Sequence, residues 1–288
     1  MHDARLAVLF LVAATFAGGC TTEVSAEHKA EDARRHFIGE GRLAREYWVD
    51  VPAQCAGKVC PGVILLHSES EIAQNLAVKL GFDRLSKEHG FVVVAPSAST
   101  GSWAALEHTQ GRADNLSYLD KVVATLPSLK IDPKHLYVVG YGSGGWMAHA
   151  LASERSQEIA AMAEAGASVA RLDSAWVYHS QPDPKRPVSV LMMHGMLDDV
   201  CGYDMRSFSL DIPTAAEWWA KRVAPGAPKV HTDLASGAVL QDAWVGKGAD
   251  VTLLSFRNLT HEWPGTRDEI DGFETNETVW KFLSAHSL

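Results

Sequence analysis

Three segments of the chain place chemically capable side chains just after a run of apolar residues. The first, 136–145, ends in a glycine-dense turn that contains Ser143. In the second segment an apolar run is followed by Asp198, and in the third another is followed by His261. A hydroxyl, a carboxylate and an imidazole in this chain order are the nucleophile, orienting acid and general base of acyl-transfer chemistry. The order predicts that the three segments converge on one site.

The elements that must position these residues are visible as apolar runs of strand length. The middle runs lack polar alternation, as expected of strands buried on both faces of a parallel sheet. The predicted strands cover 47–51, 63–66, 91–95, 136–139, 188–193 and 251–256. Between them, apolar residues recur at helical spacing over 72–88, 116–126, 147–152, 215–223 and 278–284. This alternation predicts an α/β fold with a mostly parallel central sheet, helices on both faces and a site at the carboxyl ends of the strands.

The composition describes a globular body. The chain has 288 residues, of which 47% are hydrophobic and 21% charged, which excludes a disordered or fibrous protein. Its 26 basic and 35 acidic residues give a net charge of −9, which argues against a nucleic-acid partner held by phosphate contacts. No linker or repeat divides the chain, so we predict one domain over 45–288.

The N-terminus has the pattern of an export signal. Apolar or small residues fill 6–17, a stretch too short to cross a bilayer as a helix. The following Gly-Gly-Cys resembles the end of a bacterial lipobox, which implies lipidation of Cys20. We predict a lipoprotein-type signal peptide over 1–20, a polar tether over 21–44, and a location in the bacterial cell envelope with a lipid anchor as the membrane contact. An ordinary cleaved signal, which would give a secreted or periplasmic protein, is the alternative.

The remaining cysteines fit an oxidising compartment. Cys55 and Cys60 close a short loop and are predicted to form a disulfide. Their spacing would also suit a metal hairpin, but no second Cys/His pair with ligand spacing follows, so we predict no metal site. Cys201 is left over and is predicted to be a buried thiol.

The motifs around the three candidate groups are similar to those of a known family. The sequence Asp-Pro-Lys-His-Leu-Tyr-Val at 132–138 leads into the turn, His194 and Gly195 precede Asp198 and Tyr203, and His261 begins His-Glu-Trp-Pro-Gly. These segments resemble the Asp-Pro-x-Arg-Val-Tyr-Val, His-Gly-x-x-Asp and His-x-Trp-Pro-Gly motifs of secreted polyhydroxybutyrate depolymerases and feruloyl esterases, a group of α/β hydrolases.

The resemblance covers about 45–285 and carries expectations for fold and function. It implies an α/β-hydrolase fold and a carboxylic ester hydrolase that acts on small or polymeric esters without a cofactor. By the same resemblance, Asp198 is the acid that orients the base and His261 is the general base. The alternative is a catalytically inactive homologue that uses the same cleft to bind a ligand or partner.

The nucleophile departs from the family pattern. Alignment of the turn glycines puts Gly142 where the family has serine, and a glycine has no atom with which to attack. In one interpretation Ser143 is the catalytic nucleophile, reached by a one-residue slip of the turn. In the other interpretation the turn has lost its nucleophile, and hydrolysis is slow, with His261 activating a water.

The rest of the predicted site comes from loops beside the turn. Backbone N–H groups near Ser68, Glu69 and Gly144 are predicted to form the oxyanion hole, although Ser68 replaces the glycine usual in relatives. Aromatic side chains are predicted to line the substrate pocket. These are Trp103, Tyr203 and Trp263.

Overall fold

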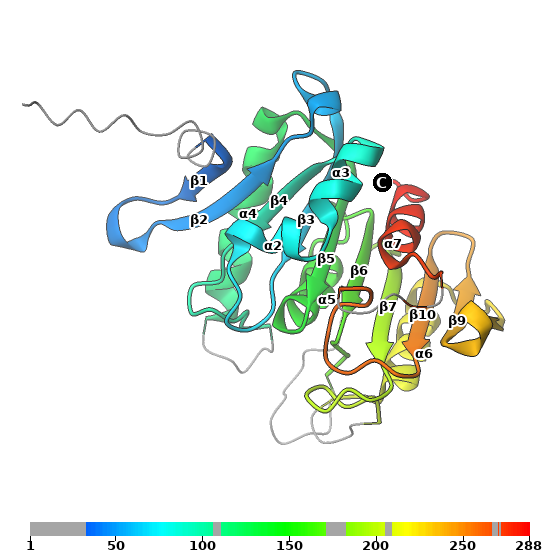
Figure 1. The fold of residues 1–288 in the computed structure, drawn as a ribbon. Coiled ribbons are helices and arrows are strands. Elements are labelled where there is room, and N and C mark those ends of the chain that lie inside the picture. The colour runs from blue at the N-terminus through cyan, green and yellow to red at the C-terminus, as the bar shows by residue number, and fades with distance from the viewer. Residues whose placement is uncertain (1–32, 106–110, 171–182, 205–208, 267–269, 271) are drawn as a thin grey trace, which may run out of the picture. The chain divides into compact units, whose positions relative to one another are not determined.

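The computed structural model describes residues 33–105, 111–170, 183–204, 209–266, 270 and 272–288 (Figure 1). The predicted signal peptide, Cys20 and most of the predicted tether lie outside these residues. The compact unit from Arg34 to Leu288 contains all the elements described below. None of the helices in this described part has the length and apolar character needed to span a bilayer.

A single ten-stranded sheet runs through the unit in the order β1-β2-β4-β3-β5-β6-β7-β10-β9-β8 (Figure 1). The six strands from β4 to β10 in this order are parallel, and the two strands at each edge are antiparallel to their neighbours. The strands are β1 Arg35–Ile38, β2 Arg45–Asp50, β3 Cys60–Leu66, β4 Val92–Pro96, β5 Ile131–Tyr141, β6 Ala161–Ala165, β7 Ser189–Gly195, β8 Lys229–Leu234, β9 Val239–Val245 and β10 Asp250–Phe256.

The helices connect the strands of the sheet. They are α2 Leu76–Lys79, α3 Phe82–His89, α4 Arg112–Thr125, α5 Ser143–Glu154, α6 Ile212–Val223 and α7 Thr275–Ser284. Short 3-10 helices are Gly41–Leu43, Ala53–Cys55, Ala73–Asn75, Leu126–Leu129 and Ala235–Gly237. The predicted helix over 72–88 is divided because Gly81, with φ 77°, ends α2 and begins α3. A right-handed α-helix cannot continue through a residue in the left-handed conformation.

The central strands are buried on both faces because their apolar residues alternate between two cores. Val63 and Leu65 pack with residues of α2, α3 and α7, whereas Ile64 and Leu66 pack with residues of α4, α5 and α6. All four side chains are fully buried. The predicted uninterrupted apolar run, the parallel sheet and the helical layers are therefore confirmed.

Two parts of the sheet differ from the sequence prediction. Arg35–Ile38 lies within the predicted tether but forms β1, paired antiparallel to β2 with Arg35 opposite Trp48. Strand β6 is also absent from the prediction, since its run Ala-Met-Ala-Glu-Ala contains the fully buried Glu164 and has little β-propensity. Both strands form because neighbouring strands offer them hydrogen-bonding partners. The sequence of four or five residues does not by itself show that such partners are present.

Candidate active site

The turn between β5 and α5 has the backbone of a nucleophile elbow. Gly142 joins the strand to the helix with φ 53° and ψ −120°, a conformation that a residue with a Cβ adopts only under strain. An added Cβ on Gly140 would lie 2.1 Å from the Gly144 carbonyl oxygen. An added Cβ on Gly144 would lie 2.2 Å from the Leu66 carbonyl oxygen. The glycines thus let the first turn of α5 approach β3 closely.

The predicted acid and base lie side by side. Asp198 follows β7 and His261 follows β10, the neighbouring parallel strand. His261 Nδ1 and Asp198 Oδ2 are 2.8 Å apart, and because a carboxylate can only accept, the ring nitrogen donates. Oδ1 of the same carboxylate accepts the N–H groups of Val200 and Cys201, at 2.9 and 2.8 Å. The carboxylate is therefore held in place and fixes the orientation of the imidazole.

Hydrogen bonding determines the protonation state of this pair. Burial alone would raise the pKa of the Asp198 carboxyl. Hydrogen bonds from His194, His261 and the Cys201 N–H outweigh burial and hold this pKa well below its usual range. For His261, burial lowers the pKa, but the hydrogen bond and charge of Asp198, aided by Glu69, raise it above its ordinary value. An ionised acid beside a more basic imidazole is the arrangement that a general base requires.

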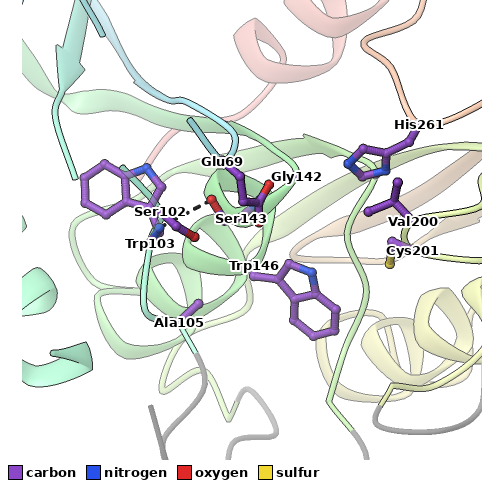
Figure 2. Close-up of a pocket in the computed structure, with 11 residues that line it drawn as sticks. Glu69, Ser102, Trp103, Ala105, Gly142, Ser143, Trp146, Val200, Cys201 and His261 are labelled. Carbon is purple, nitrogen blue, oxygen red and sulfur yellow. Dashed lines mark hydrogen bonds between the residues drawn. The ribbon is translucent and has the colours of Figure 1, made fainter. Parts of the chain in front are cut away.

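His261 and the elbow face the same cavity of about 250 Å³ (Figure 2). Gly142, Ser143 and Glu69 line it from the elbow side, and His261 lines it from the loop after β10. Gly166 lies under the ring, since an added Cβ there would come within 2.9 Å of the imidazole. The cavity therefore lies at the carboxyl ends of the parallel strands, as expected.

Ser143 does not meet the histidine. It is the first residue of α5 and is buried, and its Oγ accepts the backbone N–H of Trp103 at 3.3 Å. Figure 2 shows this oxygen turned toward the Trp103 segment, on the side away from His261. The structure thus places the Gly142 backbone, and not the Ser143 hydroxyl, on the cavity side facing the ring.

Side chains from the loop after β3 occupy the position where residue 142 would project. An added Cβ on Gly142 would lie 2.1 Å from Ser68 Oγ and 3.0 Å from Glu69 Oε2. Ser68 Oγ donates a hydrogen bond to Glu69 Oε2 at 2.7 Å. Sequence reasoning assigned Ser68 and Glu69 to the oxyanion hole through their backbone and missed these side-chain positions. The signal available in the sequence was Ser68 at a position where the resemblance predicts glycine, beside a turn where it predicts serine at Gly142.

Carboxylates of the chain accept hydrogen bonds from N–H groups at and beside the predicted oxyanion hole. The Ser68 N–H donates to Glu71 Oε2 at 3.0 Å. The Ser143 N–H, at the start of α5, donates to Glu69 Oε2 at 3.4 Å. Gly144 lies against the backbone of β3. The N-terminus of α5 therefore already holds a negative charge, as its dipole favours.

The aromatic residues predicted for the pocket have different positions. Trp103 lines the cavity together with Trp146, which the sequence analysis did not identify. Tyr203 and Trp263 are not among the residues that line this cavity. The Tyr203 hydroxyl lies 2.6 Å from Ser255 Oγ. Trp263 is buried because it packs edge-on against a phenylalanine of α3 and donates its indole N–H to a side chain of α7.

The cysteines have the predicted arrangement. Cys55 and Cys60 form a disulfide with an S–S distance of 2.08 Å. Cys201 is a buried free thiol beside the Asp198 loop, and burial raises its pKa. A thiol with this environment is a poor nucleophile.

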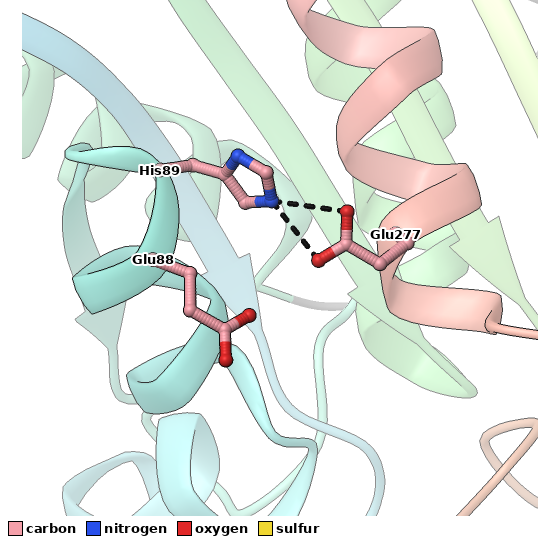
Figure 3. A group of neighbouring side chains, drawn as sticks. All are labelled: Glu88, His89 and Glu277. Carbon is pink, nitrogen blue, oxygen red and sulfur yellow. Dashed lines mark hydrogen bonds and ion pairs between the residues drawn. The ribbon is translucent and has the colours of Figure 1, made fainter.

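Among the described residues, Glu88, His89 and Glu277 bring three possible metal-ligand atoms within 4.8 Å of one another (Figure 3). His89 Nε2 lies 2.9 and 3.0 Å from the two carboxylate oxygens of Glu277, which joins α3 to α7. Glu88 and His89 are exposed. We interpret His89 and Glu277 as a hydrogen-bonded pair that links two helices, with Glu88 beside it.

Comparisons with known proteins agree with the fold. No protein-family model matches the chain. A bifunctional acetylxylan esterase/xylanase from Neocallimastix patriciarum is 27% identical over 168 residues, which is 57% of this chain but about a quarter (23%) of that protein's length. An acetyl xylan esterase from Aspergillus awamori has a TM-score of 0.60 at 14% identity, covering 87% of this chain and 98% of that one. An S-formylglutathione hydrolase from Agrobacterium tumefaciens has a TM-score of 0.60 at 15% identity, covering 87% and 94%. The chain therefore has the α/β-hydrolase fold.

Proposed function

We propose that the protein hydrolyses carboxylic esters in the cavity between the elbow and His261. The observation that carries this proposal is the 2.8 Å hydrogen bond between Asp198 and His261 at the carboxyl ends of adjacent strands. Because Nδ1 carries the proton donated to Asp198, Nε2 is the basic nitrogen that can take a proton from an attacking hydroxyl or water oxygen. Asp198 then stabilises the resulting imidazolium. The esterase relatives support the same reaction class.

The dimensions of the cavity favour esters with a short acyl group. A volume of about 250 Å³ is below the range usual for pockets that enclose a drug-sized ligand. Val200 lines the cavity and is 62% exposed, and Leu197, 57% exposed, lies in the same loop. An apolar rim around a small cavity suits one ester unit of a larger molecule, with the rest of the molecule outside. We propose esters of this kind, such as the hydroxybutyrate esters suggested by the motifs and the acetyl esters of xylan suggested by the relatives. Feruloyl esters, which the motifs also suggest, have a larger acyl group and are the second candidate.

Hydrolysis of p-nitrophenyl acetate, methyl ferulate, acetylated xylan and poly(3-hydroxybutyrate) by the purified protein tests the proposal. His261→Ala is expected to lower kcat/KM for the best substrate by on the order of 100-fold or more, the contribution of a general base. His231→Ala is the matched control, because His231 is an exposed histidine paired with Asp242 at 2.7 Å on the outer strands β8 and β9. Its activity should equal that of the wild-type protein.

The result that would contradict ester hydrolysis is a wild-type protein with no turnover of any of these esters. Turnover that is the same in the wild type and in His261→Ala would contradict the assigned base. Ligand binding in the cavity without turnover would favour the alternative, a non-catalytic binding protein.

We further propose that the protein acts in the bacterial cell envelope, anchored through a lipid on Cys20. The Cys55–Cys60 disulfide supports an oxidising compartment. Metabolic labelling with a palmitate analogue tests the anchor. The label should be incorporated by the wild-type protein and lost in Cys20→Ala, whereas Cys201→Ala should retain it.

A further inference from the structure

We propose that Ser68 supplies the nucleophilic hydroxyl that the elbow lacks, with Glu69 as the acceptor of its proton. This inference rests on the proposed ester hydrolysis and names the attacking oxygen for that reaction. Proteins with glycine at this position have no side chain there, and the inference assigns a chemical role to the side chain that this protein has.

The position of the Ser68 oxygen carries the inference. Ser68 Oγ lies 2.1 Å from the point where a Cβ of residue 142 would be. The hydroxyl oxygen of an elbow serine is one covalent bond from its Cβ, so Ser68 Oγ lies within the volume that an elbow side chain would occupy. Ser68 itself is buried, and its neighbours Glu69 and Gly142 line the cavity. Because Gly142 has no side chain, this volume is open to the loop after β3, and the Ser68 hydroxyl occupies it.

The neighbouring carboxylate can activate this hydroxyl. The Ser68 O–H donates to Glu69 Oε2 at 2.7 Å, a charge-assisted hydrogen bond. Glu69 lines the cavity, and its charge contributes to raising the pKa of His261 on the other side. Ser143, the other hydroxyl at the elbow, is turned toward the Trp103 N–H. Of the two hydroxyls, only that of Ser68 is bonded to a group that can accept its proton.

The acylation step follows from these contacts. Ser68 Oγ bonds to the ester carbonyl carbon while its proton passes to Glu69 Oε2, and the carbonyl π electrons move onto the carbonyl oxygen. Protonation removes the charge of Glu69, which weakens its hydrogen bond to the Ser143 N–H. That N–H, at the N-terminus of α5, is then available to the new oxyanion. When the oxyanion collapses, the C–O bond to the alcohol breaks, and the leaving oxygen takes the proton from Glu69.

Hydrolysis of the acyl-enzyme uses the imidazole. His261 removes a proton from a water molecule, whose oxygen attacks the acyl carbon. The bond between that carbon and Ser68 Oγ breaks, and the serine oxygen takes the proton back from the imidazolium. The free acid leaves, and both side chains return to their initial states.

The experiment combines covalent labelling with kinetics. The wild-type protein is treated with a fluorophosphonate, which reacts with activated hydroxyls, and the modified peptide is identified by mass spectrometry. The adduct is expected on Ser68. Ser68→Ala should lose the adduct and lower turnover by on the order of 100-fold or more, and Glu69→Gln should slow labelling. Ser70→Ala, a change at an exposed serine of the same loop, should label and turn over like the wild type.

A double variant that moves the serine from position 68 to position 142 provides a second test, which does not depend on whether Ser68→Ala folds normally. In Gly142→Ser/Ser68→Gly, the adduct should move to position 142. An adduct on Ser143, or undiminished turnover in folded Ser68→Ala, would overturn the role of Ser68 and leave ester hydrolysis intact. A wild-type protein with neither adduct nor turnover would overturn both the inference and the proposed function.

Discussion

Gly142→Ser alone should destabilise the protein, and Ser68→Gly should relieve part of that loss. The new Cβ would lie 2.1 Å from Ser68 Oγ and 3.0 Å from both Ser68 Cβ and Glu69 Oε2. Overpacking of this kind costs about 1–3 kcal/mol. The φ of 53° adds about 1–3 kcal/mol for a residue with a side chain. We expect the single substitution to lower the free energy of unfolding by about 2–6 kcal/mol, the sum of the two contributions.

The two contributions can be separated because only the steric part depends on Ser68. Ser68→Gly removes both the Oγ and the Cβ that the new side chain would meet. Backbone strain at position 142 remains. The double variant should therefore be more stable than the sum of the single effects predicts, with a coupling energy of about 1–3 kcal/mol.

Urea unfolding of the wild type, both single variants and the double variant gives this coupling energy. The control cycle replaces Ser68→Gly by Ser70→Gly, because Ser70 is exposed in the same loop and also has a positive φ of 58°. That cycle should be additive within about 0.5 kcal/mol. A coupling energy near zero between positions 142 and 68 would refute the conclusion that Ser68 occupies the space of the missing side chain.

Three further predictions concern protonation and the disulfide. Glu69→Gln should lower the pKa of His261, because the substitution removes one of the negative charges that raise this pKa. An NMR titration of the His261 ring whose midpoint pH is unchanged or higher in the variant would contradict this. Burial raises the pKa of Glu164 to about 8, so the free energy of unfolding should fall by about 1.4 kcal/mol per pH unit between about pH 5 and pH 7 as the unfolded carboxyl ionises. Glu164→Gln should lack this slope in urea unfolding at several pH values, and parallel curves for the two proteins would show that the explanation fails. Replacing both Cys55 and Cys60 by alanine should cost about 2 kcal/mol, because the bridge closes a loop with a sequence separation of 5, and calorimetry under oxidising conditions would detect the lower Tm.

The local sequence was sufficient to predict an element where the whole pattern lies within one segment. The run 63–66 has no polar residue, which is typical of a strand buried on both faces of a sheet, and the structure confirms it as part of β3. The glycines around position 142 indicated a tight strand-to-helix turn, which the structure also contains. Strand β6 could not be recognised in this way, since its alanines and Glu164 are buried only through the strands on either side.

The amino-acid sequence by itself determined the α/β architecture, the order of the three candidate segments and the glycine at the elbow, because composition, periodicity and spacing are properties of the chain. Only the tertiary structure decided which groups meet. It paired Asp198 with His261, turned Ser143 toward Trp103 and brought the Ser68 hydroxyl to Gly142. The direction of a side chain depends on the neighbours that packing supplies from distant segments. The loop after β3 and the turn before α5 are about seventy residues apart in sequence, yet they contact each other in the fold. This contact could not be predicted from the sequence of either segment.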